Sequence, residues 1–306
     1  MKNNEPAAEV RFSSAQVEEW RGTGFVLIND FFRNDEIAGV VEDYERLYGD
    51  RRTDQAPDNP EMAGEFNKYQ FRNVHVLPYQ ASVQTNLLSL HPALIEFARA
   101  LLGVDKVHLY QSHSWAKFTG GANYEQPHHC DFGNHTLAVP ADNPGYRTVD
   151  FIVYLTDVSD DLGAMHYVTK PDSDAILGPG AVTAPAEMQA ALKGSEKSAA
   201  GPAGTLVAHG IDTFHRGTNL TATGGVRYTM TVGYKAAGND LVGFHVWQAG
   251  QGRDWSNILA NATPAQLECL GIPSPGHPYW TERTLRLTQA RWPDWDMSEY
   301  IARSKS

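Results

Sequence analysis

The stretch RTVDFIVYLTDV, residues 147–158, decides the fold class of this chain. Valine, isoleucine, threonine, tyrosine and phenylalanine, which are enriched in β-strands, make up most of it. Three other stretches resemble it and are separated from it by loops rich in glycine, proline and aspartate: KVHLYQSHSWAKF (106–118), GTLVAHG (204–210) and GVRYTMTVGYK (225–235). Short runs of this kind predict an all-β core over residues 104–237, in the form of a barrel or a sandwich.

Helical patterns flank this core on both sides. SSAQVEEWRGTG (13–24) begins with a capping box of Ser13 and Gln16 and ends at glycines, which are helix-stop signals. NDEIAGVVEDYERLYGD (34–50) has one apolar face, which predicts an amphipathic helix. The other predicted helices are HPALIEFARALLG (91–103), TPAQLECLG (263–271) and TERTLRLTQARW (281–292).

The simplest organisation is one domain over residues 1–306, with helices packed around the β core. Residues 1–10 are expected to be a loose tail, residues 11–103 mostly helical, and residues 238–306 helix and loop. The polar stretch DRRTDQAPDNPEMAGE (50–65) is predicted to be a loop, because turn-forming residues dominate it.

The net charge, the cysteine count and the apolar runs of the sequence each bear on what the protein can bind and where it works. The net charge is −11, which argues against binding to nucleic acid or to an anionic membrane, because both need a basic footprint. Only Cys130 and Cys269 are present, so a reduced, cytoplasmic setting is expected. No apolar run is long enough for a membrane span.

A histidine-rich stretch, EQPHHCDFGNHTL (125–137), suggests a metal site. On a strand, residues two apart share a face, so His129 and Asp131 can reach one ion while His128 and Cys130 point away. A His-x-Asp pair alone is common by chance. It needs a second histidine to form the two-His, one-carboxylate set that leaves positions open on Fe(II).

The second histidine has two candidates, His209 and His215. His215 is favoured because Arg227 follows it on the next predicted strand, and a hairpin would bring this arginine back beside the histidine. A forked guanidinium suits a carboxylate clamp, as a dicarboxylate cofactor would need. His209 lacks this following pattern and precedes a predicted turn at Gly210.

Together these motifs resemble a known family. QPHHCD (126–131), VDFIVYLTDVSDDLGAMHYV (149–168) and HRGTN (215–219), followed by Arg227, are similar in order and spacing to the phytanoyl-CoA dioxygenase family. The resemblance runs over roughly residues 12–285. It implies a mainly β fold with flanking helices and a double-stranded β-helix core, of the jelly-roll or cupin-like type. It also implies Fe(II) and 2-oxoglutarate as cofactors, with O₂ as co-substrate.

The resemblance implies His129, Asp131 and His215 as iron ligands and Arg227 as the partner of the 2-oxoglutarate C5 carboxylate. Thr229, two residues further along the same strand face, is expected to bond to that carboxylate. The presence of Asp131 argues against halogenation, because related halogenases carry a small residue in its place.

The resemblance further implies cofactor or substrate contacts at Lys117 and Gln111, on the strand before the metal pair, and a residue close to the cofactor at His135. From the residues alone, Lys117 fits a solvated strand lysine equally well, and Gln111 and His135 fit ordinary structural residues. His166 is expected to be structural. The aromatics that can form a dry wall around the reacting atoms, or ordinary core, are Trp115, Phe118, Phe132 and Tyr154.

The expected function is oxidation of an unactivated C–H bond in a small molecule, either a natural product or an amino-acid-like metabolite, with release of succinate and CO₂. Two alternatives stay open: a cupin-like metalloenzyme that catalyses isomerisation or hydrolysis, and a barrel that binds a ligand without turnover. The expected partner is a small-molecule substrate, with no nucleic acid and no membrane. The sequence leaves the oligomeric state open between a monomer and a homodimer.

Overall fold

A computed structural model describes residues 9–49, 75–119, 125–137, 139, 143–244 and 253–304. Residues 1–8 of the predicted tail and the predicted loop at 50–65 lie outside the described residues. The largest element is a six-stranded antiparallel sheet, the major sheet, with strand order β1-β7-β4-β9-β3-β2. Its strands are β1 (Phe25–Ile28), β2 (His75–Val76), β3 (Val107–Phe118), β4 (Thr148–Tyr154), β7 (Leu206–Gly210) and β9 (Val226–Ala236).

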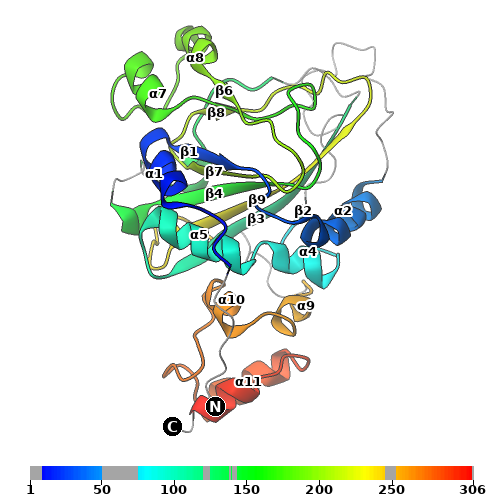
Figure 1. Cartoon of the computed structure of the whole chain (residues 1–306). Helices are drawn as coiled ribbons and strands as arrows, with labels where there is room; N and C mark the ends of the chain where they lie inside the picture. Colours follow the sequence, from blue (N-terminus) through cyan, green and yellow to red (C-terminus); the bar gives the residue numbers. More distant parts are fainter. Residues whose placement is uncertain are drawn as a thin grey trace.

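A second, three-stranded sheet, the minor sheet, has the order β6-β5-β8. Its strands are β6 (Lys197–Ser198), β5 (His166–Tyr167) and β8 (His215–Arg216). Figure 1 shows β6 and β8 above the major sheet, so the two sheets form a sandwich. A bridge between His129 and His215 adds one more residue pair to the minor sheet. The expectation of a mainly β, jelly-roll core with flanking helices is confirmed.

Helices cover the other face of the major sheet (Figure 1). These are α1 (Ser14–Thr23), α2 (Asn34–Tyr48), α4 (Val83–Leu88) and α5 (Pro92–Leu102), with α1 at the β1 edge. The predicted capping box of Ser13 and Gln16 is present at the start of α1. Gly103 ends α5 with a φ of 64°, a left-handed conformation that favours glycine.

Strand β4 is buried on both faces, which explains its nearly continuous apolar sequence. Phe151 and Val153 pack into the core under the helices, whereas Ile152 and Tyr154 pack in the space between the two sheets. The alternation of side chains along a strand therefore decides which residues face the sandwich interior.

Further helices lie outside the two sheets. On the minor-sheet side are α7 (Lys170–Leu177), η3 (Ala186–Met188) and α8 (Gln189–Ser195), while α6 (Phe132–His135) and η2 (Pro144–Tyr146) interrupt the chain between β3 and β4. At the opposite end of the molecule are α9 (Ser256–Leu259), α10 (Pro264–Glu268), α11 (Glu282–Arg291) and α12 (Ser298–Ser304). There Tyr300 packs against Trp280 and Trp295, with ring centroids 5.0 and 5.2 Å apart. Among the described helices, none is both long and apolar enough to cross a membrane.

Candidate metal centre

A cavity of about 430 Å³ lies between the two sheets. Its wall is built by inward side chains of β3, β4, β7 and β9 on one side and by the His129–His215 bridge on the other. The structure brings together every residue that the sequence singled out for the site, namely Gln111, Lys117, His129, Asp131, His135, His215, Arg227 and Thr229. Their individual roles remain predictions.

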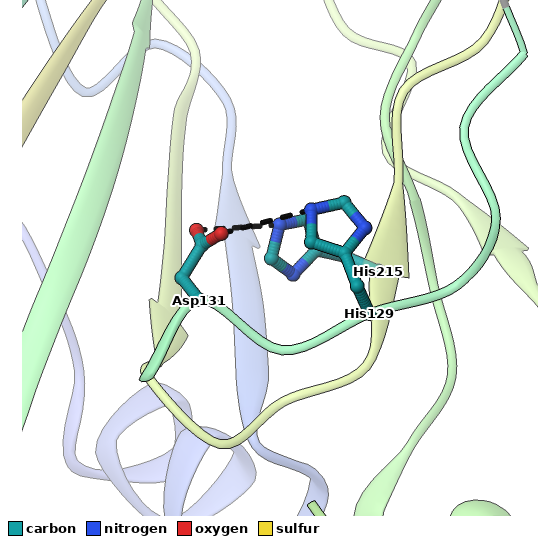
Figure 2. Close-up of side chains that lie close together, drawn as sticks. All are labelled: His129, Asp131 and His215. Carbon is teal, nitrogen blue, oxygen red and sulfur yellow. Dashed lines mark ion pairs between the residues drawn. The ribbon is translucent and has the colours of Figure 1, made fainter. Parts of the chain in front are cut away.

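Three side chains converge at one point of this cavity. The rings of His129 and His215 lie next to each other and Asp131 faces both, with Oδ1 3.6 Å from Nε2 of His129 and Oδ2 3.4 Å from Nε2 of His215. Figure 2 shows both rings turned toward the carboxylate. Their candidate ligand atoms all lie within 4.8 Å of one another. This spacing suits a single metal ion bound on one side by two nitrogens and one oxygen.

The backbone brings the three residues together in a way that differs from the prediction. His129 and His215 exchange two backbone hydrogen bonds of 3.0 Å. Asp131 does not continue a strand: it has φ −80° and ψ −7° and directly precedes α6. The expectation that His129 and Asp131 share a strand face is therefore wrong. The chain turns at Asp131 into α6, and the N–H of Asn134 donates to the Asp131 carbonyl at 2.9 Å.

Hydrogen bonds fix the tautomers of both histidines. Nδ1 of His129 lies 2.9 Å from the carbonyl of Pro127, and Nδ1 of His215 lies 3.0 Å from the carbonyl of Thr213. A carbonyl only accepts, so each Nδ1 carries a proton, and Nε2 is the ring atom that faces the cavity and can bind a metal ion once it is deprotonated. Two Nε2 lone pairs beside a carboxylate form a donor set that fits a divalent metal.

The charge of Asp131 also suits a metal ligand. Burial opposes its ionisation, but the charge and hydrogen bonds of His215 and His209 outweigh this effect and hold the pKa of Asp131 well below its usual value. The site therefore supplies one negative oxygen and two imidazole nitrogens.

His209, the second candidate in the sequence, also lines the cavity. Its ring centroid lies 5.0 Å from that of His215, but its Nε2 is 3.9 Å from Asp131 Oδ2. Its Nδ1 faces the hydroxyl of Tyr167 at 3.2 Å.

The two residues predicted to point away from the metal do so. Nε2 of His128 lies 3.0 Å from Glu196 Oε2, and Cys130 packs against a small apolar cluster that includes Leu192. His166 is likewise structural, because its Nδ1 lies 2.8 Å from Glu196 Oε1.

Two buried basic side chains form one end of the cavity, and both are cations once Lys117 is protonated. Lys117 on β3 is the register partner of Arg227 on β9, and both side chains line the cavity. The backbone carbonyls of Thr218 and Gly163 accept hydrogen bonds from Lys117 and Arg227 respectively. Burial and the neighbouring charge of Arg227 lower the pKa of Lys117 to about 6. Two cations held this way are well placed to receive an anion.

The route that brings Arg227 to the site also differs from the prediction. His215 belongs to the minor sheet and Arg227 to the major sheet, so the expected hairpin between them is wrong. The connecting segment crosses from one sheet to the other and pairs at Leu220 with Leu162. The two residues therefore face each other across the cavity instead of lying side by side on one sheet.

Several lining residues were not singled out from the sequence. Thr231 follows Arg227 and Thr229 at a spacing of two along β9, and His113 precedes Trp115 and Lys117 in the same way on β3. This period-two pattern is a signal that would have found them once one inward residue was known. Ile152, two residues before Tyr154 on β4, shows the same pattern, whereas Gln126, Asn134, Met165 and Gly217 lie outside the strands of the major sheet and show no such signal.

Two of the four aromatic residues expected to form a dry wall line the cavity. Trp115 and Tyr154 line the cavity, whereas Phe118 packs into the core beneath the helices. Phe132 is not among the residues that line the cavity. It lies on α6, where the sequence had suggested a strand.

Comparison with solved structures identifies relatives of this fold. EctD from S. alaskensis, solved with 2-oxoglutarate and 5-hydroxyectoine, has 21% identity and a TM-score of 0.56, over 76% of this chain and 79% of EctD. The non-heme alpha ketoglutarate dependent carbocyclase SnoK from nogalamycin biosynthesis has 20% identity and a TM-score of 0.54, over 75% of this chain and 87% of SnoK. The epimerase SnoN, in complex with Fe³⁺, alpha ketoglutarate and nogalamycin RO, has 19% identity and a TM-score of 0.52, over 73% of this chain and 83% of SnoN.

At these identities the solved structures establish a shared fold alone. No curated protein matches the sequence. The sequence model of the phytanoyl-CoA dioxygenase (PhyH) family matches residues 20–227, which include the histidine-rich stretch, the minor sheet, every strand of the major sheet except most of β9, and Arg227. Because this match spans more than half of the chain, the protein belongs to the phytanoyl-CoA dioxygenase family, and the expected class of iron- and 2-oxoglutarate-dependent oxygenases is confirmed with it.

Proposed function

We propose that this enzyme oxidises an unactivated C–H bond of a small molecule, with Fe(II), 2-oxoglutarate and O₂, and releases succinate and CO₂. One observation carries the proposal: the His129–Asp131–His215 set and the buried pair Lys117 and Arg227 share one cavity. We further propose that residues 1–306 form a single oxygenase domain that works in the cytoplasm.

The metal would be held by Nε2 of His129, a carboxylate oxygen of Asp131 and Nε2 of His215. With metal–ligand distances of about 2.1 Å, the ligand atoms of an octahedral face lie roughly 3 Å apart. The separations of 3.6 and 3.4 Å to Asp131 come close to this value, so only small side-chain movements would be needed. Iron with 2-oxoglutarate and O₂ would supply the oxidising chemistry.

The two buried cations would hold the far carboxylate of 2-oxoglutarate. The guanidinium of Arg227 offers a planar fork of donors, Lys117 adds a second charge, and the hydroxyl of Thr229 lies on the same strand face. A cofactor fixed at this end is oriented before it meets the metal, which lowers the entropic cost of chelation. Trp115 and Tyr154 would exclude water around the reacting atoms.

Both alternatives explain less of the cavity. A cupin-like isomerase or hydrolase would need the metal but would not require Lys117 and Arg227. A barrel that only binds a ligand would not require three converging metal ligands. The substrate class, a natural product or an amino-acid-like metabolite, is in line with SnoK and SnoN, which belong to nogalamycin biosynthesis, and with EctD, which was solved with 5-hydroxyectoine.

The decisive experiment is anaerobic absorption spectroscopy of the full chain, titrated first with Fe(II) and then with 2-oxoglutarate. We expect a weak visible charge-transfer band that needs both components. His215→Ala should abolish the band and reduce Fe(II) affinity at least about 100-fold, because it removes a proposed ligand.

The matched variant is His209→Asn, which changes the neighbouring histidine of the same cavity. It should keep one bound Fe(II) and a visible band, with altered position or strength. Loss of iron in His209→Asn with retention in His215→Ala would overturn the ligand assignment. A wild-type protein that binds Fe(II) but forms no band with 2-oxoglutarate would contradict the proposed function.

A further inference from the structure

A buried hydrogen-bond network stands behind Gln111, at the other end of the major-sheet wall from Lys117 and Arg227. Nε2 of Gln111 lies 2.6 Å from Asp150 Oδ1 and 3.0 Å from the hydroxyl of Tyr110, and that hydroxyl donates to the same Oδ1 at 2.7 Å. Asp150 and Tyr110 are 1% and 0% exposed. Neither lines the cavity, whereas Gln111 does.

This network fixes which way the Gln111 amide faces. Oδ1 of Asp150 receives two donors, so it acts as an acceptor whether or not the other carboxyl oxygen is protonated. The atom of Gln111 beside it is then the NH₂ nitrogen, which donates to Asp150 and also lies within hydrogen-bond distance of the Tyr110 hydroxyl. The part of the amide left for the cavity is the carbonyl, Oε1.

The backbone is shaped around this network. Gly233 on β9 is the register partner of both Gln111 and Asp150. A Cβ at this position would lie 2.5 Å from Asp150 Oδ1 and 2.6 Å from both Gln111 Cγ and Tyr110 Cε1. The network therefore fills the space of a missing side chain, and it is held tightly enough to keep the amide in one orientation.

We propose that Asp150 is a positioning residue that holds Gln111 as a hydrogen-bond acceptor, and that the substrate carries a donor group, such as a protonated amine or a hydroxyl, which binds Gln111 Oε1. This inference rests on the proposed function and deepens it. Ionised 2-oxoglutarate has acceptor oxygens and no donor, so it cannot satisfy a carbonyl oxygen. Of the two roles that the sequence left open for Gln111, a cofactor or a substrate contact, this assigns it to the substrate.

Asp150 adds a charge preference to this acceptor. Its Oδ2 is buried and has no hydrogen-bond partner among the described residues. The carboxyl group thus lies behind the amide with one oxygen still available. Burial raises the pKa of Asp150, and wherever its carboxyl is ionised the charge disfavours an anionic group at this end of the cavity.

The test uses three small probes of similar size that differ in the end group: 2-phenylethylammonium, 2-phenylethanol and phenylacetate. Binding to the full chain, loaded with redox-silent Zn(II) and saturating 2-oxoglutarate, is measured by ligand-observed NMR. Saturating 2-oxoglutarate keeps the carboxylate probe away from Lys117 and Arg227. We expect both donor probes to bind at least roughly tenfold more tightly than phenylacetate, because the anion leaves Gln111 Oε1 unpaired.

Asp150→Asn is the decisive variant. An asparagine offers its own oxygen or NH₂ to Gln111, so the Gln111 amide can turn and present its NH₂ to the cavity. The preference for donor probes should fall to within about threefold, whereas a loss of fold would weaken all three probes alike. Gln111→Leu should lose the preference as well. Tyr154→Phe removes a hydroxyl elsewhere in the cavity wall and should change the three affinities in parallel.

An unchanged preference in Asp150→Asn, a wild-type preference for phenylacetate, or no binding by either donor probe would overturn the inference. Failure of the proposed function has a separate signature, which is the lack of the Fe(II)–2-oxoglutarate absorption band. A protein that forms this band but shows no donor preference contradicts the role of Asp150 alone.

Discussion

The ring nitrogens of His215 and His209 are held by different partners. Nδ1 of His215 faces a backbone carbonyl, which only accepts, whereas Nδ1 of His209 faces the Tyr167 hydroxyl, which can donate or accept. The proton on Nδ1 of His215 is therefore fixed and its Nε2 faces Asp131, whereas the hydrogen bond of His209 does not fix the place of its ring proton. This difference at single atoms supports His215 as the ligand more strongly than the sequence spacing did.

A pH dependence is expected from Lys117. Its pKa in the cofactor-free protein is about 6, so the side chain is largely neutral at neutral pH. A bound carboxylate favours the charged form, so binding of 2-oxoglutarate takes up a proton at any pH above this pKa. Affinity for 2-oxoglutarate should be constant below about pH 6 and fall by up to roughly tenfold per pH unit above it.

The measurement is a titration of the Fe(II)-loaded protein with 2-oxoglutarate at several pH values, combined with calorimetry in two buffers of different ionisation enthalpy. The calorimetry should report net proton uptake above neutral pH. Lys117→Met is the control, because it should bind 2-oxoglutarate more weakly at low pH and lose this pH dependence. A wild-type affinity that stays constant from pH 6 upward, without proton uptake, would contradict a role for Lys117 in cofactor binding.

At the scale of elements, the turn before β5 supports Arg227. Gly163 has a φ of 76°, and its carbonyl accepts a hydrogen bond from Arg227. A Cβ there would lie 2.7 Å from Leu220 Cδ1 and 2.9 Å from the carbonyl of Thr218. Thr218 also bonds to Lys117, so one tight turn controls the surroundings of both cations.

Gly163→Ala should therefore lower the free energy of unfolding by about 2–4 kcal/mol, from left-handed strain and overpacking together. It should also weaken binding of 2-oxoglutarate. Gly180→Ala is the matched control: its φ is 73°, but nothing lies within 4 Å of the added Cβ, so only about 1–2 kcal/mol of strain is expected. Urea denaturation and cofactor titration measure both effects. Equal destabilisation by the two substitutions would show that the close contacts at Gly163 do not contribute to the loss in the free energy of unfolding.

Some elements were easier to predict from the sequence than others. The ends of α1 and α5 were predictable, because Ser13, Gln16 and Gly103 act on backbone groups within a few residues. The route of the chain from His215 to Arg227 was not, because it depends on which sheet each strand joins. The same applies to Asp131, whose position depends on a turn after an isolated bridge. The residues of the site were therefore found more reliably than the backbone that carries them.

At the scale of the whole molecule, charge is distributed unevenly between surface and cavity. The chain carries 36 acidic and 25 basic residues, so its long-range field repels a dicarboxylate. Lys117 and Arg227 reverse this locally, because they lie in the wall of the cavity where solvent screens them little. Affinity for an anionic cofactor is thus expected to come from short-range contacts in the cavity.

Acid stability depends on carboxylates that join separate parts of the fold. Glu36 on α2 bonds to Arg11 and Arg33, and Glu196, next to β6, bonds to Arg216 on β8. Burial alone would raise the pKa of each carboxyl, but the hydrogen bonds and charges of the partners outweigh it and lower both pKa values to about 2. Both groups therefore remain ionised in the folded protein well below the pH at which they would protonate in an unfolded chain.

The sign of the effect follows from these values. Because the folded pKa lies below the unfolded one, the stabilisation is fully present above about pH 5 and is lost as the pH falls toward 2. Glu196→Gln should lower the free energy of unfolding by about 1–3 kcal/mol at neutral pH, since it leaves Arg216 with one charged partner fewer. The difference from wild type should shrink near pH 2, where the wild-type carboxyl is itself protonated. Urea denaturation across this range measures it, with Glu187→Gln, at an exposed glutamate, as the control. A difference that is the same at neutral pH and near pH 2 would mean that Glu196 acts through packing instead of charge.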